Sequence, residues 1–223
     1  MAQDELVARL SKLDTCAASD ALDRLALRGT TTGIHPVWPC PRIVGRAVTV
    51  KVKPVGLVKS TKHLCTPAIE AAKPGDILVV DNGGRPDVSA WGGLLSLASK
   101  LKGLSGVVID GACRDVDESR DVGFPVYARA VVPLTARGRI MQDTINEEIE
   151  FGNVQVHPGD LVIADGSGVV IIPAARAAEV VAEAEKVAAH EAKMAEGIRS
   201  GRSVVEVMET LGYESMLAKD KEK

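Results

Sequence analysis

The residues of this sequence best suited to chemistry lie between positions 92 and 118. Gly92 and Gly93 open a segment of small and apolar residues, and Arg114, Asp115 and Glu118 follow a later apolar run. Backbone N–H groups at a helix start, left open by small residues, form an anion site. A guanidinium adds a planar, bidentate grip on a carboxylate. An adjacent carboxylate is a hard oxygen ligand for Mg²⁺ or Mn²⁺.

Together these groups would hold a small 2-oxo acid. Its carboxylate would lie on Arg114, and its keto oxygen would face a metal held by Asp115. A metal in that position acts as a Lewis acid on a developing enolate. The alternative is purely structural, because an Arg-Asp pair that opens a helix is often a helix cap with a surface charge pair. The residue types alone leave both interpretations open.

The predicted elements around these residues would bring them together. A helix is expected over 90–101 and a buried strand over 106–109, so twenty residues separate Gly93 from Arg114. This is about the length of one helix, one turn and one strand. Both loops should therefore lie at the same edge of a sheet, beyond the carboxyl ends of its strands, where open α/β sheets bind ligands.

The rest of the chain alternates helix and strand patterns early and clusters strand patterns late. Further helices are expected over 4–28, 63–72, 115–121, 174–197 and 203–211, further strands over 46–52, 77–80, 125–132, 153–156, 161–164 and 169–172, and a loop over 29–45. This order predicts layered sheets covered by helices, and an α/β fold class. A length of 223 residues favours one domain over residues 1–223.

Composition excludes several classes of function. The net charge is −3 and aromatic residues make up 3% of the chain, which argues against nucleic-acid binding because that needs a cationic surface and stacking rings. The four cysteines have no zinc-like spacing, so free thiols in a reducing compartment are expected. The acidic, amphipathic segment MAQDELVARL is not expected to act as a signal peptide, and no apolar run reaches the roughly 20 residues that a membrane span needs. The expected location is therefore the cytoplasm, with no membrane partner.

The segment WGGLLSLASKLKGLSGVVIDGACRDVDE resembles the signature of the RraA-like family. That family includes class II 4-hydroxy-4-methyl-2-oxoglutarate and 4-carboxy-4-hydroxy-2-oxoadipate aldolases, and the regulator of ribonuclease E activity A. The aldolase signature is a glycine, twenty residues, Arg-Asp, two residues and an acid, which Gly93, Arg114, Asp115 and Glu118 match. The resemblance extends from residues 15–22 to 159–173. The regulators typically lack the final acid, so Glu118 favours the aldolase branch.

The resemblance implies a fold, a site and an assembly. The fold would be an α-β-β-α layered sandwich, with N-terminal helices over about 4–28 and a long C-terminal helical extension over about 174–211. The backbone of Gly92, Gly93, Leu94 and Leu95 would bind pyruvate-like ligands, Arg114 would hold the substrate, and Asp115 would hold Mg²⁺ or Mn²⁺ largely through waters, with Glu118 a further candidate ligand. The family forms homotrimers or homohexamers with sites at subunit interfaces.

Glu191 is a further candidate for the metal site. On a helical wheel of the predicted C-terminal helix it falls about 20° from Val180, in the middle of an apolar stripe that includes Val187 and Met194. Because an unpartnered buried charge is costly, either the stripe is partly exposed there or Glu191 projects into a neighbouring subunit's metal site. The resemblance favours the second interpretation, since related aldolases use a C-terminal glutamate in this way.

The hypothesis from the sequence is a metal-dependent lyase. It would cleave a 4-hydroxy-2-oxo acid to pyruvate and a second oxo compound, and decarboxylate oxaloacetate through the same enolate. Arg114 and Asp115 would be catalytic, and no side chain is a clear general base. Cys113 as an activated thiol is a weaker alternative. The alternative class is a non-catalytic regulator that binds a protein partner. The segment AVVPLTARGR at 130–139 leaves the second oxo compound open.

Overall fold

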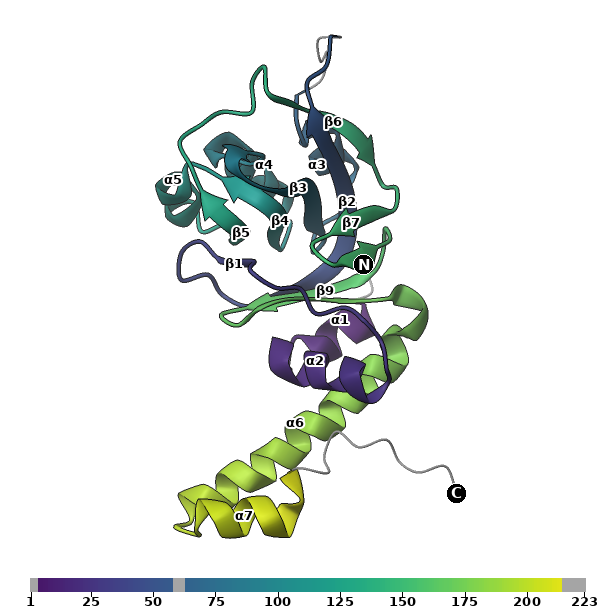
Figure 1. Ribbon diagram of the computed structural model, residues 1–223, viewed down its shortest axis with the longest axis vertical. Coiled ribbons are helices and arrows are strands. Elements are labelled where there is room, and N and C mark those ends of the chain that lie inside the picture. Colours follow the sequence, from purple (N-terminus) through teal and green to yellow (C-terminus); the bar gives the residue numbers. More distant parts are fainter. Residues whose placement is uncertain (1–3, 58–62, 214–223) are drawn as a thin grey trace.

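The computed structural model describes residues 4–57 and 63–213, and its centre is an eight-stranded sheet (Figure 1). The order is β1-β5-β4-β3-β2-β9-β10, and β6 also pairs with β2. The strands are β1 (His35–Pro36), β2 (Ile43–Pro54), β3 (Ile77–Ser89), β4 (Gly106–Cys113), β5 (Val126–Val131), β6 (Ile140–Ile145), β9 (Leu161–Asp165) and β10 (Gly168–Ile172). β2, β3, β4 and β5 run parallel to one another, and their Val- and Ile-rich cores are buried on both faces, as parallel sheets require.

The sheet folds back on itself, so that three apolar clusters separate four layers. α3 (Thr66–Ala71), α4 (Gly93–Lys102) and α5 (Val116–Asp121) cover one face of β2–β5. The opposite face of these strands packs on β9, β10 and the hairpin of β7 (Ile149–Phe151) and β8 (Val154–Val156). α1 (Glu5–Leu10), α2 (Thr15–Arg24) and α6 (Ala177–Arg199) cover β9 and β10 from outside. The predicted α-β-β-α sandwich is confirmed.

The segment before β2 brings the sheet close to closure. Thr30 pairs with Val170 of β10, and His35 pairs with Ala128 of β5 a few residues later. The predicted loop over 29–45 is therefore wrong in part, because it contains β1 near its middle and the first residues of β2 at its end. Its Gly, Pro and Thr content is typical of loops, but the two flanking strands supply hydrogen-bond partners that no local pattern reveals.

Strand lengths depart from prediction in the same way. β3 does not end at Val80 but continues through two left-handed glycines, Gly83 and Gly84, and pairs again with β4 where Arg85 lies opposite Gly111. β6 and β7 were not predicted, because the sequence IMQDTI of β6 has no regular alternation and is stabilised by pairing with β2. The helical segment expected over 4–28, in one or two pieces, forms two helices, which Asp4 and Asp14 cap.

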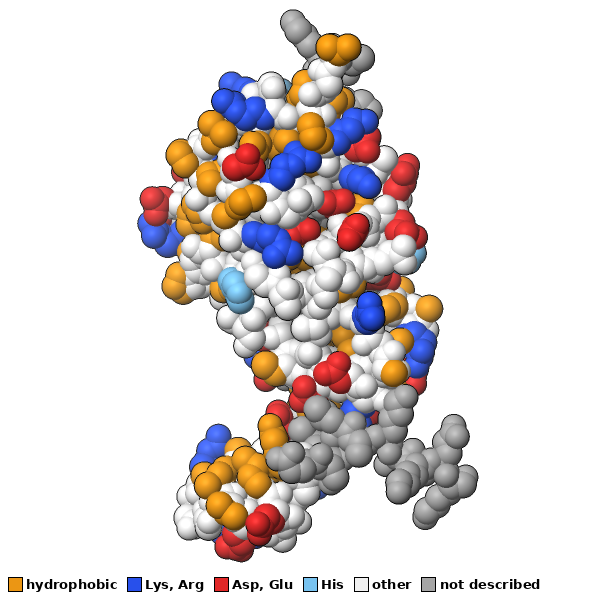
Figure 2. Space-filling model, in the orientation of Figure 1, with side chains coloured by type: hydrophobic (Ala, Val, Ile, Leu, Met, Phe, Trp, Pro, Cys, Tyr) orange, Lys and Arg blue, Asp and Glu red, His pale blue; other side chains and the backbone are white. Residues whose placement is uncertain are grey.

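The long C-terminal helix is present, and it leaves the body of the molecule. After a 3₁₀ turn at Ala174–Arg176, the first half of α6 packs on α2, while its second half projects outward with α7 (Val204–Leu211) folded back against it (Figure 1). Hydrophobic side chains gather on this arm, where Val204 and Val205 are exposed (Figure 2). None of the helices within residues 4–57 and 63–213 combines the length and apolar character that a membrane crossing requires.

Candidate functional site

The glycine pair and the Arg-Asp pair lie together where two parallel strands end. The chain leaves β3 into α4 and leaves β4 into α5, and two backbone hydrogen bonds join the exits. Ala90 N donates to Ala112 O over 2.8 Å, and Arg114 N donates to Trp91 O over 3.0 Å. The start of α4 is therefore held beside the start of α5. The structure brings together Gly92, Gly93, Leu94, Leu95, Arg114, Asp115 and Glu118 at the sheet edge named from the sequence.

The structural alternative requires the Asp115 side chain to cap its own helix, and it does not. It occupies the N-cap position of α5 without a side-chain hydrogen bond to that helix, and its backbone is left-handed with φ 55° and ψ 44°. This conformation costs a residue with a Cβ about 1–2 kcal/mol. It directs the carboxylate towards α4, where Oδ2 accepts the Gly93 N–H over 3.0 Å and lies 3.3 Å from Arg114 Nε. The start of α4 does bind an anion, and in this structure that anion is Asp115.

This arrangement changes which backbone groups remain for a ligand. The N–H of Gly93 is used by Asp115, and the N–H of Leu95 donates to Gly92 O over 3.1 Å. The N–H of Leu94 makes no hydrogen bond to any residue the structure describes. The N–H of Gly92 likewise has no such partner, so of the four residues predicted to bind a pyruvate-like ligand through their backbone, Gly92 and Leu94 keep open donors at the helix start.

Both glycines are required by the close approach of α5. A Cβ on Gly93 would overlap the Glu118 carboxylate, and a Cβ on Gly92 would lie 2.7 Å from Asp115 Oδ2. The backbone of Gly92 is extended, with φ −155°, so space and not conformation demands glycine there. The glycine, the Arg-Asp pair and the following acid are thus parts of one packing contact. That contact gives a physical reason for their spacing.

Arg114 is placed to bind an anionic ligand. Its side chain is 38% exposed, and its Nε faces Asp115 Oδ2. Within the described residues its two Nη groups make no hydrogen bond, so several donors remain for a carboxylate. A guanidinium oriented by a neighbouring carboxylate loses less freedom when it binds a second one.

The oxygen donors at this site fit a water-rich divalent cation. Asp115 is 29% exposed, and its Oδ1 accepts no hydrogen bond from the described residues. The Glu118 carboxylate lies over Gly93, on the same side of the α4 start. In the described parts of the chain no three or more His, Cys, Asp or Glu side chains are grouped to hold a metal. One or two carboxylates with several waters is the coordination that Mg²⁺ accepts.

Two other sequence candidates lie outside this cluster. Cys113 is fully buried, and burial raises the pKa of its thiol to about 12, so it is not an activated nucleophile. Glu191 is half-buried on α6, in the stripe predicted for it, with Val187 and Met194 buried on either side. Burial raises the pKa of Glu191, and Asp14 and Asp20 raise it further. Whether Glu191 reaches a neighbouring subunit stays a prediction.

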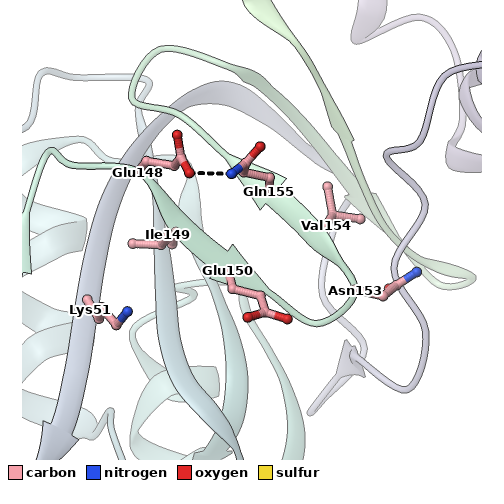
Figure 3. Close-up of a pocket in the computed structure, with 7 residues that line it drawn as sticks. All are labelled: Lys51, Glu148, Ile149, Glu150, Asn153, Val154 and Gln155. Carbon is pink, nitrogen blue, oxygen red and sulfur yellow. Dashed lines mark hydrogen bonds between the residues drawn. The ribbon is translucent and has the colours of Figure 1, made fainter.

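A hollow of about 350 Å³ lies elsewhere, over the β7–β8 hairpin (Figure 3). Lys51 of β2 and residues 148–150 and 153–155 of the hairpin segment line it, including Glu148, which accepts a hydrogen bond from Gln155. Its lining has neither a glycine-opened helix start nor an arginine. None of its residues was singled out from the sequence, and the charged groups there form an ordinary solvated face. The stronger candidate remains the α4–α5 cluster.

Sequence reasoning missed three buried polar groups behind the cluster. Trp91, Ser96 and Ser119 are buried between α4 and α5 and are hydrogen-bonded to one another. Trp91 also stacks on Phe124, with ring centroids 6.1 Å apart. The available signal was a serine in each short helix, at positions where an apolar residue would be expected on a core-facing stripe.

Comparison with known proteins agrees with this geometry. The family model described as RraA-like (Aldolase/RraA) matches residues 15–171. The chain belongs to the RraA-like family. A Halalkalibacterium halodurans member, provisionally named 4-hydroxy-4-methyl-2-oxoglutarate aldolase, is 31% identical over 83% of this chain and 84% of that protein. Protein DlpA of Legionella pneumophila is 28% identical over 94% of this chain, which spans 34% of DlpA.

Solved structures of RraA-like proteins share the fold over most of the chain. An uncharacterized protein from Pseudomonas syringae matches with a TM-score of 0.82 and 32% identity, over 91% of this chain and 96% of that one. Streptomyces coelicolor RraAS2, described as an unusual member of the RNase ES inhibitor RraA protein family, matches with a TM-score of 0.79 and 27% identity, over 90% and 99%. The RraA-like family therefore holds proteins named as aldolases and proteins described as ribonuclease inhibitors.

Proposed function

We propose that this RraA-like protein is a lyase that depends on Mg²⁺ or Mn²⁺ and cleaves a 4-hydroxy-2-oxo acid to pyruvate and a second oxo compound. The observation that carries the proposal is the joined start of α4 and α5, where Arg114, Asp115 and Glu118 converge on the Gly92–Gly93 pair. A guanidinium with open donors and two oxygen ligands suits a 2-oxo acid. The names of the relatives support a lyase of this kind.

The proposed mechanism assigns a task to each residue. Arg114 binds the substrate carboxylate through its open Nη donors and offsets negative charge on the enolate. Asp115, oriented by the Gly93 N–H, and Glu118 would hold the cation. When bound, Mg²⁺ or Mn²⁺ supplies a Lewis acid at the keto oxygen. The 4-hydroxyl loses its proton to water and becomes the new carbonyl, while the electrons of the C3–C4 bond form the pyruvate enolate, which is then protonated at C3.

Oxaloacetate offers the simplest test of this reaction. Loss of CO₂ from oxaloacetate leaves the same pyruvate enolate, so one site should catalyse both reactions. We expect pyruvate release from 4-hydroxy-2-oxo acids and from oxaloacetate with Mg²⁺ or Mn²⁺, and its arrest by a chelator. A chain that releases no pyruvate from any such acid would instead support the regulator class, which the likeness to RraAS2 keeps as the second candidate. Binding to a ribonuclease would then be the measurement to make.

The Gly93→Ala variant should separate activity from folding. The added methyl group would displace the Glu118 carboxylate from the start of α4. We expect kcat/KM to fall at least about tenfold, which is about 1.4 kcal/mol of transition-state stabilisation. Alanine favours helices over glycine by about 1 kcal/mol, which offsets part of the cost of moving Glu118, whose Cβ would lie 2.9 Å from the new methyl carbon, so the free energy of unfolding should fall by no more than about 2 kcal/mol. Urea unfolding and pyruvate release would measure both quantities, and full activity in this variant would remove Glu118 from the proposed site.

We also propose that the chain assembles as a homotrimer or a dimer of trimers. Leu94, Leu97 and Leu101 of α4 are 80%, 42% and 80% exposed and form an apolar stripe that begins at the site. An exposed apolar face of this kind is typical of a surface buried by another subunit. Glu191 lies on a second element that leaves the body of the molecule. In this proposal Glu191 of one subunit reaches towards Asp115 of its neighbour.

Subunit mixing tests the shared site. Asp115→Asn and Glu191→Gln proteins, each of low activity, should regain part of the wild-type activity when unfolded and reassembled together, because some hybrid interfaces pair an intact Asp115 with an intact Glu191. Glu196→Gln, an exposed acid on the same helix, serves as the control and should be as active as wild type. A native protein that sediments as a monomer, or a mixture that stays inactive while wild type recovers, would contradict the shared site.

A further inference from the structure

A chain of three hydrogen bonds, two of them buried and the last part-buried at Asp115, links the core of the protein to Asp115. Trp91 Nε1 donates to Ser96 Oγ over 2.9 Å, Ser96 Oγ and Ser119 Oγ lie 2.8 Å apart, and Ser119 Oγ donates to Asp115 O over 3.1 Å. The three side chains are 2%, 0% and 1% exposed and lie among apolar residues of the cluster beneath α4 and α5. Water therefore does not compete for the first two bonds.

The groups at the two ends of the chain of hydrogen bonds, the Trp91 N–H and the Asp115 carbonyl, determine which atom donates in each bond. An indole N–H can only donate and a backbone carbonyl can only accept, while each serine hydroxyl has one hydrogen to give. Ser119 must therefore give its hydrogen to Asp115 O, and Ser96 must give its own to Ser119. A single arrangement satisfies all three donors. Loss of the Ser96 hydroxyl leaves the Trp91 N–H without its acceptor, and loss of the Ser119 hydroxyl leaves the Ser96 hydroxyl without its acceptor and Asp115 O with the Ser119 N–H alone.

The last bond acts on the backbone that aims the Asp115 carboxylate. Asp115 O accepts both the Ser119 N–H, over 3.0 Å, and the Ser119 hydroxyl. The same residue has the left-handed conformation that points its carboxylate at Gly93 rather than along α5. The chain also ties the first two turns of α4 to α5 through Ser96. These hydrogen bonds therefore hold both Gly93 and Asp115 in place from the core side of the two helices.

We infer that Trp91, Ser96 and Ser119 are positioning residues for Asp115. They touch neither the substrate nor the cation of the proposed lyase, on which this inference rests for its meaning in catalysis. Their task is to hold the Asp115 backbone so that the carboxylate stays on the α4 start with one oxygen free. Outer partners of metal ligands typically contribute about 10–100-fold to metal affinity or activity when they are intact.

The protein offers a matched control for Ser96 about one turn further along α4. Ser99 of α4 is fully buried like Ser96, but its hydroxyl has no hydrogen-bond partner among the described residues. Three alanine variants therefore remove the same atom from similar surroundings: Ser96→Ala, Ser119→Ala and Ser99→Ala. Only the first two interrupt the chain of hydrogen bonds. Trp91→Phe is a fourth variant, which keeps an aromatic ring beside Phe124 but removes the N–H donor together with part of the buried ring.

Amide exchange at Gly93 reads the position of Asp115 without reference to activity. In ¹⁵N-labelled protein free of metal, we expect Ser96→Ala and Ser119→Ala to raise the exchange rate of the Gly93 N–H roughly tenfold, and Ser99→Ala to leave it unchanged. The Mn²⁺ dissociation constant should rise about tenfold in the first two variants only. The loss of activity should lie in kcat at saturating Mn²⁺, with the substrate KM near wild type.

The outcomes separate this inference from the proposed function. Gly93 exchange in Ser96→Ala and Ser119→Ala that matches Ser99→Ala would overturn the positioning role, and so would an equal rise in all three variants. Trp91→Phe decides the matter if a serine variant does not fold, because it breaks the chain at its far end. A wild-type protein that neither binds Mn²⁺ nor releases pyruvate would count against the lyase, while Gly93 exchange would still decide the role of the chain.

Discussion

Asp115→Asn should lower kcat/KM for pyruvate release by at least about a hundredfold, or about 2.7 kcal/mol of transition-state stabilisation. The substitution removes the negative charge that would hold the cation and orient Arg114. It leaves an amide oxygen that can still accept the Gly93 N–H, and asparagine tolerates a left-handed backbone. The free energy of unfolding should therefore fall by no more than about 1 kcal/mol.

Asp117→Asn provides the matched control for this result. Asp117 lies two residues further along, in the first turn of α5, and pairs with Arg120 on the surface over 2.8 Å. A surface pair of this kind contributes about 0–1 kcal/mol, and its loss should not change turnover. Mn²⁺ binding, measured beside activity, should weaken in Asp115→Asn alone. Wild-type turnover of Asp115→Asn at saturating metal would exclude Asp115 as the metal-holding residue.

Arg114→Lys should lower kcat/KM about tenfold to a thousandfold, or about 1.4–4 kcal/mol. Lysine keeps the positive charge but has no planar pair of donors for a carboxylate. Its single ammonium group would also pair with Asp115, which leaves less of it for the substrate. Since the lost interaction is with substrate and enolate, we expect both a higher KM and a lower kcat.

Arg120→Lys tests whether any arginine near the site would give this effect. Arg120 lies on α5 and makes its ion pairs with Asp117 and Asp121, away from Gly93. Its replacement should leave both kinetic constants unchanged. If Arg114→Lys had wild-type kinetics, the shape of the guanidinium would be irrelevant, and the carboxylate site would have to lie elsewhere on the molecule.

The sequence predicted those features of the site that depend on local pattern. The Val- and Ile-rich runs that become β3 and β4, and the polar residues after them, place Gly93 and Arg114 at one edge through the geometry of parallel strands alone. The same logic could not show that Asp115 binds the start of α4 rather than its own helix. That choice depends on a left-handed backbone, which tertiary contacts stabilise and no spacing encodes.

The parts of the fold that escaped prediction have a common cause. β1 and β6 are short strands without regular alternation that form because a neighbouring strand offers unpaired backbone groups. The second half of β3 follows two glycines that usually end a strand, and the bulge opposite Gly111 restores its pairing with β4. Ser96 and Ser119 occupy core-facing positions of short helices, but their hydrogen bond to each other forms only when the two helices pack together.

The two backbone hydrogen bonds between the exits of β3 and β4 constrain the number of residues in the segment from Gly93 to Arg114. Ala90 is hydrogen-bonded to Ala112 and Trp91 to Arg114, so α4, its turn and β4 must together connect two positions whose separation is fixed. Many side chains on the outer face of α4 could be exchanged without moving either end. An inserted or deleted residue in β4 would turn Arg114 to the opposite face of the sheet. We therefore expect this segment to tolerate amino-acid substitutions far more readily than insertions or deletions.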